Sequence, residues 1–282
     1  MTMRTPCMLP VAVAAAAALA APAVADTVTL QPIADGTLIE SATVQQYALG
    51  AALNIYCGRV GTNGGGTLRR SVLRYDLSAL PPGAVVTSVS LKVYMSQTNS
   101  GAQTINMHRL QEKWGEGASF AFGGGGTVPE TNDATWIHTF YPGQLWSVPG
   151  GKFAATPSAS KSIAAAGAYT FTSTPALVAD VAAWQANPAL NCGWILVGNE
   201  AALDTAKRFE SRESADPTRR PLLTITYTQG PIPGDFDGDG KVNGLDLGVL
   251  LSHWGEGGAW DMDADGTVNG ADLALLIAAW RN

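Results

Sequence analysis

The C-terminal end of the sequence contains the same acidic pattern twice. Each copy reads D-x-D-x-D-G-x-x-N-x-x-D, the first starting at Asp235 and the second 26 residues later at Asp261. The pattern places side-chain oxygens at positions 1, 3, 5, 9 and 12 of a loop, and a glycine at position 6, where the chain must turn sharply. A duplication in register indicates one structural unit repeated, whereas a single copy could be an ordinary acidic turn.

This spacing predicts two calcium-binding loops. Calcium accepts about six to eight oxygen ligands in a flexible geometry, and position 7 needs to supply only its backbone carbonyl. Magnesium requires a tighter octahedron, and zinc would need His or Cys, which both loops lack. The predicted ligands are Asp235, Asp237, Asp239, Lys241, Asn243 and Asp246 in the first loop, and Asp261, Asp263, Asp265, Thr267, Asn269 and Asp272 in the second.

A short helix is predicted after each loop. Apolar residues follow both loops with the i, i+3, i+4, i+7 spacing that is typical of a helix burying one face. They are Leu247, Leu250, Leu251 and Trp254 in the first copy, and Leu273, Leu276, Ile277 and Trp280 in the second. Gly255 is expected to end the first helix.

Two loop-plus-helix repeats with Asn at position 9 and Asp at position 12 resemble a type I dockerin, over roughly the last 50 residues. The resemblance implies a module that binds two calcium ions and docks onto a cohesin-like partner. Positions 10 and 11, which mediate cohesin recognition in that family and are often Ser-Thr, are Gly244-Leu245 and Gly270-Ala271 in this chain.

Charge divides the chain into two regions. Residues 231–282 hold nine acidic residues against Lys241 and Arg281, whereas residues 26–230 hold 14 acidic and 14 basic residues. The tail is too small to bury a large core, and two calcium ions would offset part of its excess charge. We therefore predict that the tail is disordered or molten without calcium. The chain's net charge of −6 argues against a nucleic-acid partner.

The Pro- and Gly-rich segment 229–234 is expected to be a linker, between a domain at residues 26–228 and the acidic module at 235–282. At the other end, residues 1–25 combine Arg4, an Ala-rich apolar stretch and an A-x-A sequence that ends at Ala25. This order is typical of a secretory signal peptide, and a membrane anchor is the alternative. No later apolar run approaches the ~20 residues of a membrane helix, so we expect a secreted or cell-surface protein.

Removal of that segment would leave two cysteines, Cys57 and Cys192. An even count in an oxidising compartment favours one disulfide, with two buried free thiols as the alternative.

The larger region is expected to be an antiparallel β-sandwich, resembling a jelly roll. Residues 71–77, 86–94 and 222–227 alternate apolar and polar side chains, and residues 194–197 form a continuous apolar run. Residues 175–184 instead have helical spacing, with a break at Asn187-Pro188.

A series of segments in this region resembles the DNRLRE domain. They are residues 70–81, 113–117, 134–136, 180–184, 209–213 and 220–227. The resemblance implies an extracellular jelly roll related to carbohydrate-binding modules, and a non-catalytic binding or surface-structural role. It also makes Glu210, Arg212 and Glu213 members of an ion-pair network or a metal-supporting edge.

Signs of catalysis are weak. His108 or His138 could act as a base beside a tyrosine, as in a polysaccharide lyase, and Glu116 with Glu130 could serve a glycoside hydrolase, but neither pair lies in a catalytic signature. The segment 61–67 lacks the lysine of a phosphate-binding loop and is expected to be a hairpin turn.

Two further groups of residues, the paired arginines and the tryptophans, could have either a structural or a ligand-binding role. Arg69-Arg70 and Arg219-Arg220 are expected to be solvated strand ends or to form internal ion pairs rather than to bind an anionic partner. Among the tryptophans, Trp184 and Trp194 are expected in the core, whereas Trp136 and Trp146 are the candidates for an exposed platform that stacks on sugar rings.

The sequence therefore favours a secreted, non-catalytic protein. Its sandwich would bind extracellular polysaccharide, and its calcium-dependent tail would dock onto a cohesin-like partner. The alternatives are a cell-surface or extracellular-matrix structural or adhesion protein, and a carbohydrate-active enzyme.

Overall fold

The computed structural model describes residues 25–41, 45–230 and 232–280. These residues form two compact units, which divide between Gly230 and Pro231, inside the expected linker. The expected signal peptide lies outside the described residues except for Ala25, which begins the first strand. Within the described ranges no helix is long and apolar enough to cross a membrane.

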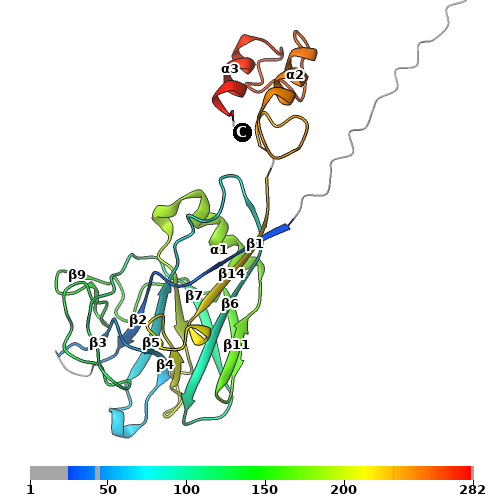
Figure 1. Ribbon diagram of the computed structural model, residues 1–282. Helices are drawn as coiled ribbons and strands as arrows, with labels where there is room; N and C mark the ends of the chain where they lie inside the picture. Colours follow the sequence, from blue (N-terminus) through cyan, green and yellow to red (C-terminus); the bar gives the residue numbers. More distant parts are fainter. Residues whose placement is uncertain (1–24, 42–44, 231, 281–282) are drawn as a thin grey trace, which may run out of the picture. The chain divides into compact units, whose positions relative to one another are not determined.

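The larger unit, Ala25–Gly230, is an antiparallel β structure (Figure 1). Its strands are β1 (Ala25–Leu30), β2 (Ala34–Ile39), β3 (Ala48–Leu49), β4 (Asn54–Arg59), β5 (Leu68–Arg74), β6 (Val85–Thr98), β7 (Gln103–Arg109), β8 (His138–Phe140), β9 (Gln144–Leu145), β10 (Ala159–Ile163), β11 (Gly167–Phe171), β12 (Trp194–Val197), β13 (Lys207–Glu210) and β14 (Leu222–Thr228). All four strands expected from the sequence are present, and the expected mainly β, antiparallel fold is confirmed.

One continuous path of hydrogen bonds curls this sheet around its core. The strand order is β1-β14-β6-β13-β4-β5-β12-β7-β10, with β11 on β6, and β2 and β3 beside β5. The curl passes through β4, whose first residues pair with β13 while Gly58 and Arg59 pair with β5. Gly58 has φ +110, and a Cβ there would lie 2.9 Å from the carbonyl oxygen of Thr205. Only glycine fits this bend.

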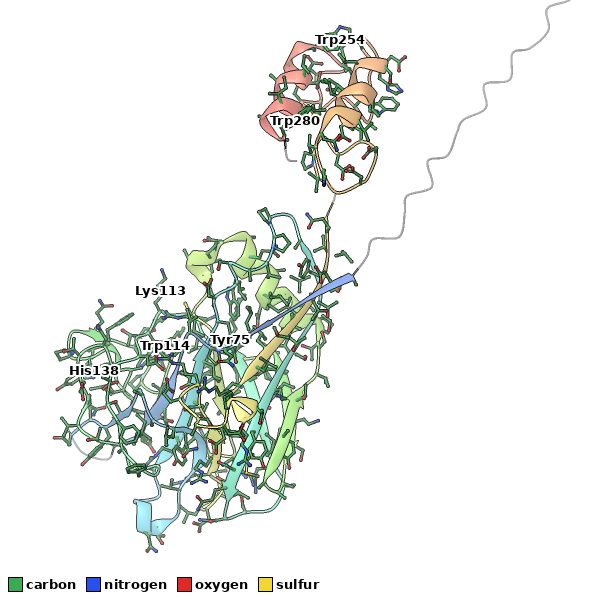
Figure 2. All side chains as sticks on the ribbon, in the orientation of Figure 1. Tyr75, Lys113, Trp114, His138, Trp254 and Trp280 are labelled. Atoms are coloured by element: carbon green, nitrogen blue, oxygen red, sulfur yellow. The ribbon has the colours of Figure 1, made fainter. Side chains whose placement is uncertain are left out.

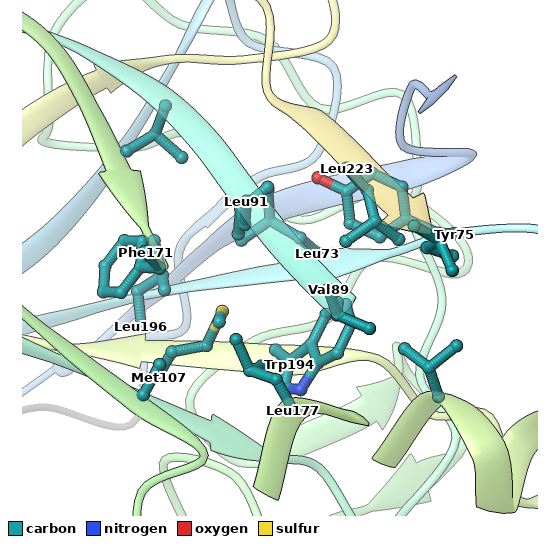
Figure 3. Close-up of a cluster of buried hydrophobic side chains, with 14 of the residues drawn as sticks. Leu73, Tyr75, Val89, Leu91, Met107, Phe171, Leu177, Trp194, Leu196 and Leu223 are labelled. Atoms are coloured by element: carbon teal, nitrogen blue, oxygen red, sulfur yellow. The ribbon is translucent and has the colours of Figure 1, made fainter. Parts of the chain in front are cut away.

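The core lies between the two halves of the curled sheet (Figure 3). On β6 the alternation is direct, since Val89, Leu91 and Val93 are fully buried while Ser90 and Lys92 are not. Apolar side chains from the opposite half and from α1 (Pro175–Ala186) pack against them, including those of Leu73, Met107, Leu177, Trp194 and Leu196.

The helix α1 begins and ends at side-chain signals in the sequence. The Thr174 hydroxyl accepts the N–H of Leu177, and the helix ends before Asn187, as expected. Trp184 on α1 meets Trp194 on β12 edge to face, with 4.6 Å between ring centroids. The Nε1–H of Trp194 donates to the buried carboxylate of Asp180, so the helix is fixed to the sheet by apolar and polar contacts.

The segment 61–67 forms the connection expected from the sequence. A 3-10 turn at Thr62–Gly64 joins β4 to β5, which pair antiparallel at Gly58 and Arg69. The hairpin interpretation is therefore confirmed.

The expected disulfide is wrong: Cys57 and Cys192 are free, buried thiols. A Cβ on Gly198 would lie 2.8 Å from the Cα of Gly58, so Cys57 lies next to the end of β12. Cys192 lies before the start of the same strand, whose four residues span about 13 Å at ~3.3 Å each. A disulfide requires Cα atoms within about 7 Å of each other.

The thiols supply a direct test. Burial raises the pKa of both Cys57 and Cys192, so native protein should resist alkylation. We expect no label on a folded chain that starts at Asp26, and two labels after denaturation without reductant. Intact mass measures both states, and a denatured chain that takes no label until it is reduced would restore the disulfide.

Candidate calcium-binding module

The smaller unit is built from two equivalent halves. Each acidic loop leads into one short helix, α2 (Gly244–Ser252) or α3 (Gly270–Ala278). The fully buried apolar side chains come in equivalent pairs, Val242 with Val268 and Leu250 with Leu276. Because this core is so small, the stability of the folded module depends on the structure of its loops.

Each loop is wound around its first aspartate. In the first loop, one carboxylate oxygen of Asp235 accepts the N–H groups of Gly238 and Asp239, at 2.8 and 3.1 Å, and the other accepts that of Gly240 at 2.9 Å. Asp261 accepts equivalent bonds from Asp265 and Gly266 in the second loop. The sequence pattern thus produces the same turn twice.

The last aspartate of each loop also has a structural role, which was not predicted from the sequence. Asp246 is completely buried, and its carboxylate accepts the N–H groups of Phe236, Asp237 and Asn243. Burial opposes its ionisation, but these N–H donors hold its pKa below the usual range. With Asn243 it also forms a capping box at the start of α2, and Asn269 and Asp272 repeat the arrangement on α3.

The structure brings carboxylates together in both loops. One ligand oxygen from each of Asp235, Asp237 and Asp246 lies within 4.8 Å of the others. The N–H of Asp239 lowers the pKa of Asp237, but desolvation and the surrounding carboxylates raise it overall.

The second loop gathers Asp261, Asp263 and Asp265, which are positions 1, 3 and 5, whereas the first gathers positions 1, 3 and 12. An all-oxygen set of like charges fits a hard divalent cation. Of the other predicted ligands, Asp239 accepts the N–H of Lys241, and the carbonyl of Thr267 accepts a side-chain N–H of Asn269.

The apolar stripes are only half buried, contrary to the expectation of one core-facing stripe per helix. Leu250 and its equivalent Leu276 are buried, whereas the last two members of each stripe are exposed. The exposed residues are Leu251, Trp254, Ile277 and Trp280, of which both tryptophans are labelled in Figure 2. Helix α2 also ends at Ser252, three residues before the predicted stop at Gly255.

Residues 233–279 match the family model of the dockerin type I domain. The match supports a calcium-dependent module that docks onto a cohesin partner, as the duplicated loops predict. The DNRLRE resemblance of the larger unit stays a prediction. No curated protein matches the chain.

In the sandwich, the sugar-stacking prediction is wrong for Trp146. This side chain is only 4% exposed, because it packs in a hydrophobic cluster with Trp114 and Ile195 and its Nε1–H donates to the carbonyl of Thr135. Trp136 is partly exposed, but the guanidinium of Arg70 lies 4.8 Å from its ring centroid. Trp146 is therefore not an open platform, whereas sugar stacking on Trp136 stays a prediction.

The two candidate catalytic histidines, His108 and His138, contact different residues in the described structure. His108 is buried with Nδ1 2.8 Å from the carbonyl oxygen of Ala154, and burial lowers its pKa. His138 (Figure 2) contacts the Thr135 hydroxyl and meets the ring of Tyr141 edge to face at 5.0 Å.

The paired arginines mostly bind within the protein. Arg70 binds Glu200 with two hydrogen bonds of 2.7 and 2.9 Å, and Arg219 pairs with Asp216. Arg69 is buried and donates to the carbonyl of Gly124. The ion pairs are therefore present for Arg70 and Arg219, whereas Arg69 and Arg220 donate to backbone carbonyls.

The predicted ion-pair network is also present. Arg212 binds Glu213 at 2.8 Å and also Glu116, one of the glutamates proposed for catalysis. Glu210 accepts the hydroxyl of Ser214 instead, and Glu130, the other proposed catalytic glutamate, is exposed.

One feature of the larger unit had no sequence signal. A cleft of about 1010 Å³ is bordered by the loop at residues 76–86, the end of α1 and Lys113. Three residues that line it have a buried polar atom without a hydrogen-bond partner within the described protein: the Nε of Arg74, the Nε1 of Trp184 and the Oδ1 of Asn191. The polar lining residues, which also include Asp76 and Gln185, suit a hydroxylated ligand.

Position 4 of the loops supplies a test of their geometry. Both loops need a left-handed residue there, and the first has Gly238 at φ 77 while the second has Ala264 at φ 60. A left-handed alanine costs about 1–2 kcal/mol. Ala264→Gly should therefore stabilise the calcium-loaded module by about 1 kcal/mol, measured by denaturant unfolding.

The matched control is Gly238→Ala, because a Cβ at Gly238 would meet no atom within 4 Å. It should destabilise the module by about 1 kcal/mol through the backbone alone. Equal effects of the two substitutions, with the same sign, would contradict this loop geometry.

Proposed function

We propose that this is a secreted, non-catalytic protein whose tail fixes a β-sandwich to a cohesin-like partner when calcium is bound. The observation that carries the proposal is the duplicated loop-and-helix structure, in the residues that match the dockerin type I model. Two calcium ions, one per loop, would offset the repulsion among the grouped aspartates.

The exposed apolar residues provide the docking surface. Leu251 and Trp254 in the first half have equivalents in Ile277 and Trp280, so both halves present the same chemistry. Position 11 adds Leu245, which is 65% exposed, where the family often has a hydroxyl side chain. The preferred partner should therefore offer an apolar surface rather than hydroxyl-binding groups.

Calcium removal tests both the fold and the docking. The isolated peptide 231–282 should lose its helical circular dichroism in excess chelator, and the full chain should lose at least ~100-fold in affinity for a cohesin domain that binds it in calcium. The double variant Asp235→Ala, Asp261→Ala should behave like the chelated protein. Glu256→Ala, an exposed acid outside both ligand sets, should behave like wild type.

A peptide whose circular dichroism is unchanged by chelator would contradict calcium-dependent folding. A tail that folds with calcium but binds no cohesin domain would support the calcium sites and contradict the docking proposal.

For the sandwich we propose a polysaccharide ligand in the cleft beside α1. The polar side chains of Asp76, Gln185 and Asn191 border this space and can bond sugar hydroxyls. The exposed Lys113 (Figure 2) adds positive charge at the edge, which favours a chain with carboxylate groups.

Affinity electrophoresis with polygalacturonate and with a neutral glucan tests this ligand. Lys113→Ala should weaken binding to polygalacturonate about 2- to 5-fold and leave glucan binding unchanged, because one solvent-exposed charge contributes up to ~1 kcal/mol. Lys152→Ala, an exposed lysine that does not line the cleft, is the control. Retardation by neither polysaccharide would favour a structural or adhesion role.

The enzyme alternative is supported by one observation, the contact between His138 and Tyr141. A lyase would release unsaturated products and a glycoside hydrolase would release new reducing ends. Either product from a purified chain, lost on His138→Ala, would replace the non-catalytic proposal.

A further inference from the structure

Three carboxylates from distant parts of the chain meet inside the sandwich. Asp35 lies on β2, Glu116 in the loop after β7, and Glu213 in the loop after β13. One ligand oxygen from each lies within 4.8 Å of the others. The cluster belongs to the larger unit, so it is separate from the acidic loops of the tail.

One arginine neutralises only part of this charge. Arg212 donates to both oxygens of Glu116, at 2.9 and 2.7 Å, and forms an ion pair with Glu213, with 2.8 Å between Arg212 Nε and Glu213 Oε1. Its backbone N–H donates to Asp35 Oδ2 at 2.7 Å. Three carboxylates therefore face a single guanidinium, which leaves two negative charges in a largely buried place.

The buried oxygens of the cluster are not all satisfied. Asp35 is completely buried, and its Oδ1 has no hydrogen-bond partner within the described protein. The Oε2 of Glu213 is buried and unpartnered as well. An unpaired buried charged acceptor destabilises the folded state. A structural ion-pair network explains the bonds of Arg212 but leaves these two oxygens unexplained.

We propose that Asp35, Glu116 and Glu213 hold a calcium ion in the sandwich. A divalent cation matches the two uncompensated charges, and the ligands are all hard oxygens. Oxygens on opposite sides of calcium are at most about 5 Å apart, which accommodates the spacing of this cluster. Magnesium gives up its water reluctantly, so it suits the fully buried Asp35 less well.

The ion would have a structural effect. It would join β2, in one half of the curled sheet, to the loop that leaves β13 in the other half. Binding only to the folded state then raises the melting temperature of the sandwich as calcium concentration rises. The competing arrangement is a proton shared by Asp35 and Glu213, which would need no metal.

The test uses the full chain with the tail loops disabled, so that a failure of the docking proposal does not affect the result. Four substitutions remove the tail ligands: Asp235→Ala, Asp237→Ala, Asp261→Ala and Asp263→Ala. We expect calorimetric titration with calcium to find one remaining site per chain. We also expect calcium to raise the melting temperature of the sandwich by roughly 5–10 °C over chelator. No uptake, with an unchanged melting temperature, would overturn the site and favour the shared proton.

A matched pair of variants in that background assigns the ligands. Glu213→Gln keeps an acceptor for Arg212 but removes one ligand charge, and it should weaken calcium binding at least ~10-fold. Glu200→Gln makes the same change in the ion pair with Arg70, away from the cluster, and should leave calcium affinity unchanged. Equal calcium affinity in the two variants would place the ion elsewhere.

Discussion

Carboxylate charge that the chain cannot neutralise by itself is the constraint on which both units depend. In the tail, eight aspartates occur with one lysine and one arginine, and the loops wrap backbone N–H groups around Asp235 and Asp261. In the sandwich, one arginine faces three carboxylates. N–H groups lower the energy of a carboxylate but carry no net charge, so the remaining repulsion favours a cation in each case.

The tail also joins ion binding to helix formation through shared residues. Asn243 and Asp246 belong to the predicted ligand set of the first loop, and the same side chains cap the first turn of α2. A helix of nine residues is marginal alone, because its nucleation is costly. The loop supplies that nucleus, so disruption of the loop removes the start of the helix as well. This sharing explains why loop and helix repeat together as one unit.

The sequence was informative where local signals decide the structure and less so where distant segments meet. Alternation along β6 and β14, the end of α1 at Asn187-Pro188 and the loop glycines all act within a few residues, and each was predicted. The burial of Trp146 was not predicted, because it depends on packing against Leu38 and Ile195, which are distant in the sequence. Asp35 gave no signal for the same reason, since its neighbours Glu116 and Arg212 are 81 and 177 residues away.

The two buried thiols bear on how this protein can be made. No covalent cross-link holds the sandwich, whose core and curled ladder of hydrogen bonds are complete without one. Its folding therefore requires no disulfide-forming oxidant and no disulfide isomerase. The same domain would tolerate reductants that unfold disulfide-dependent proteins.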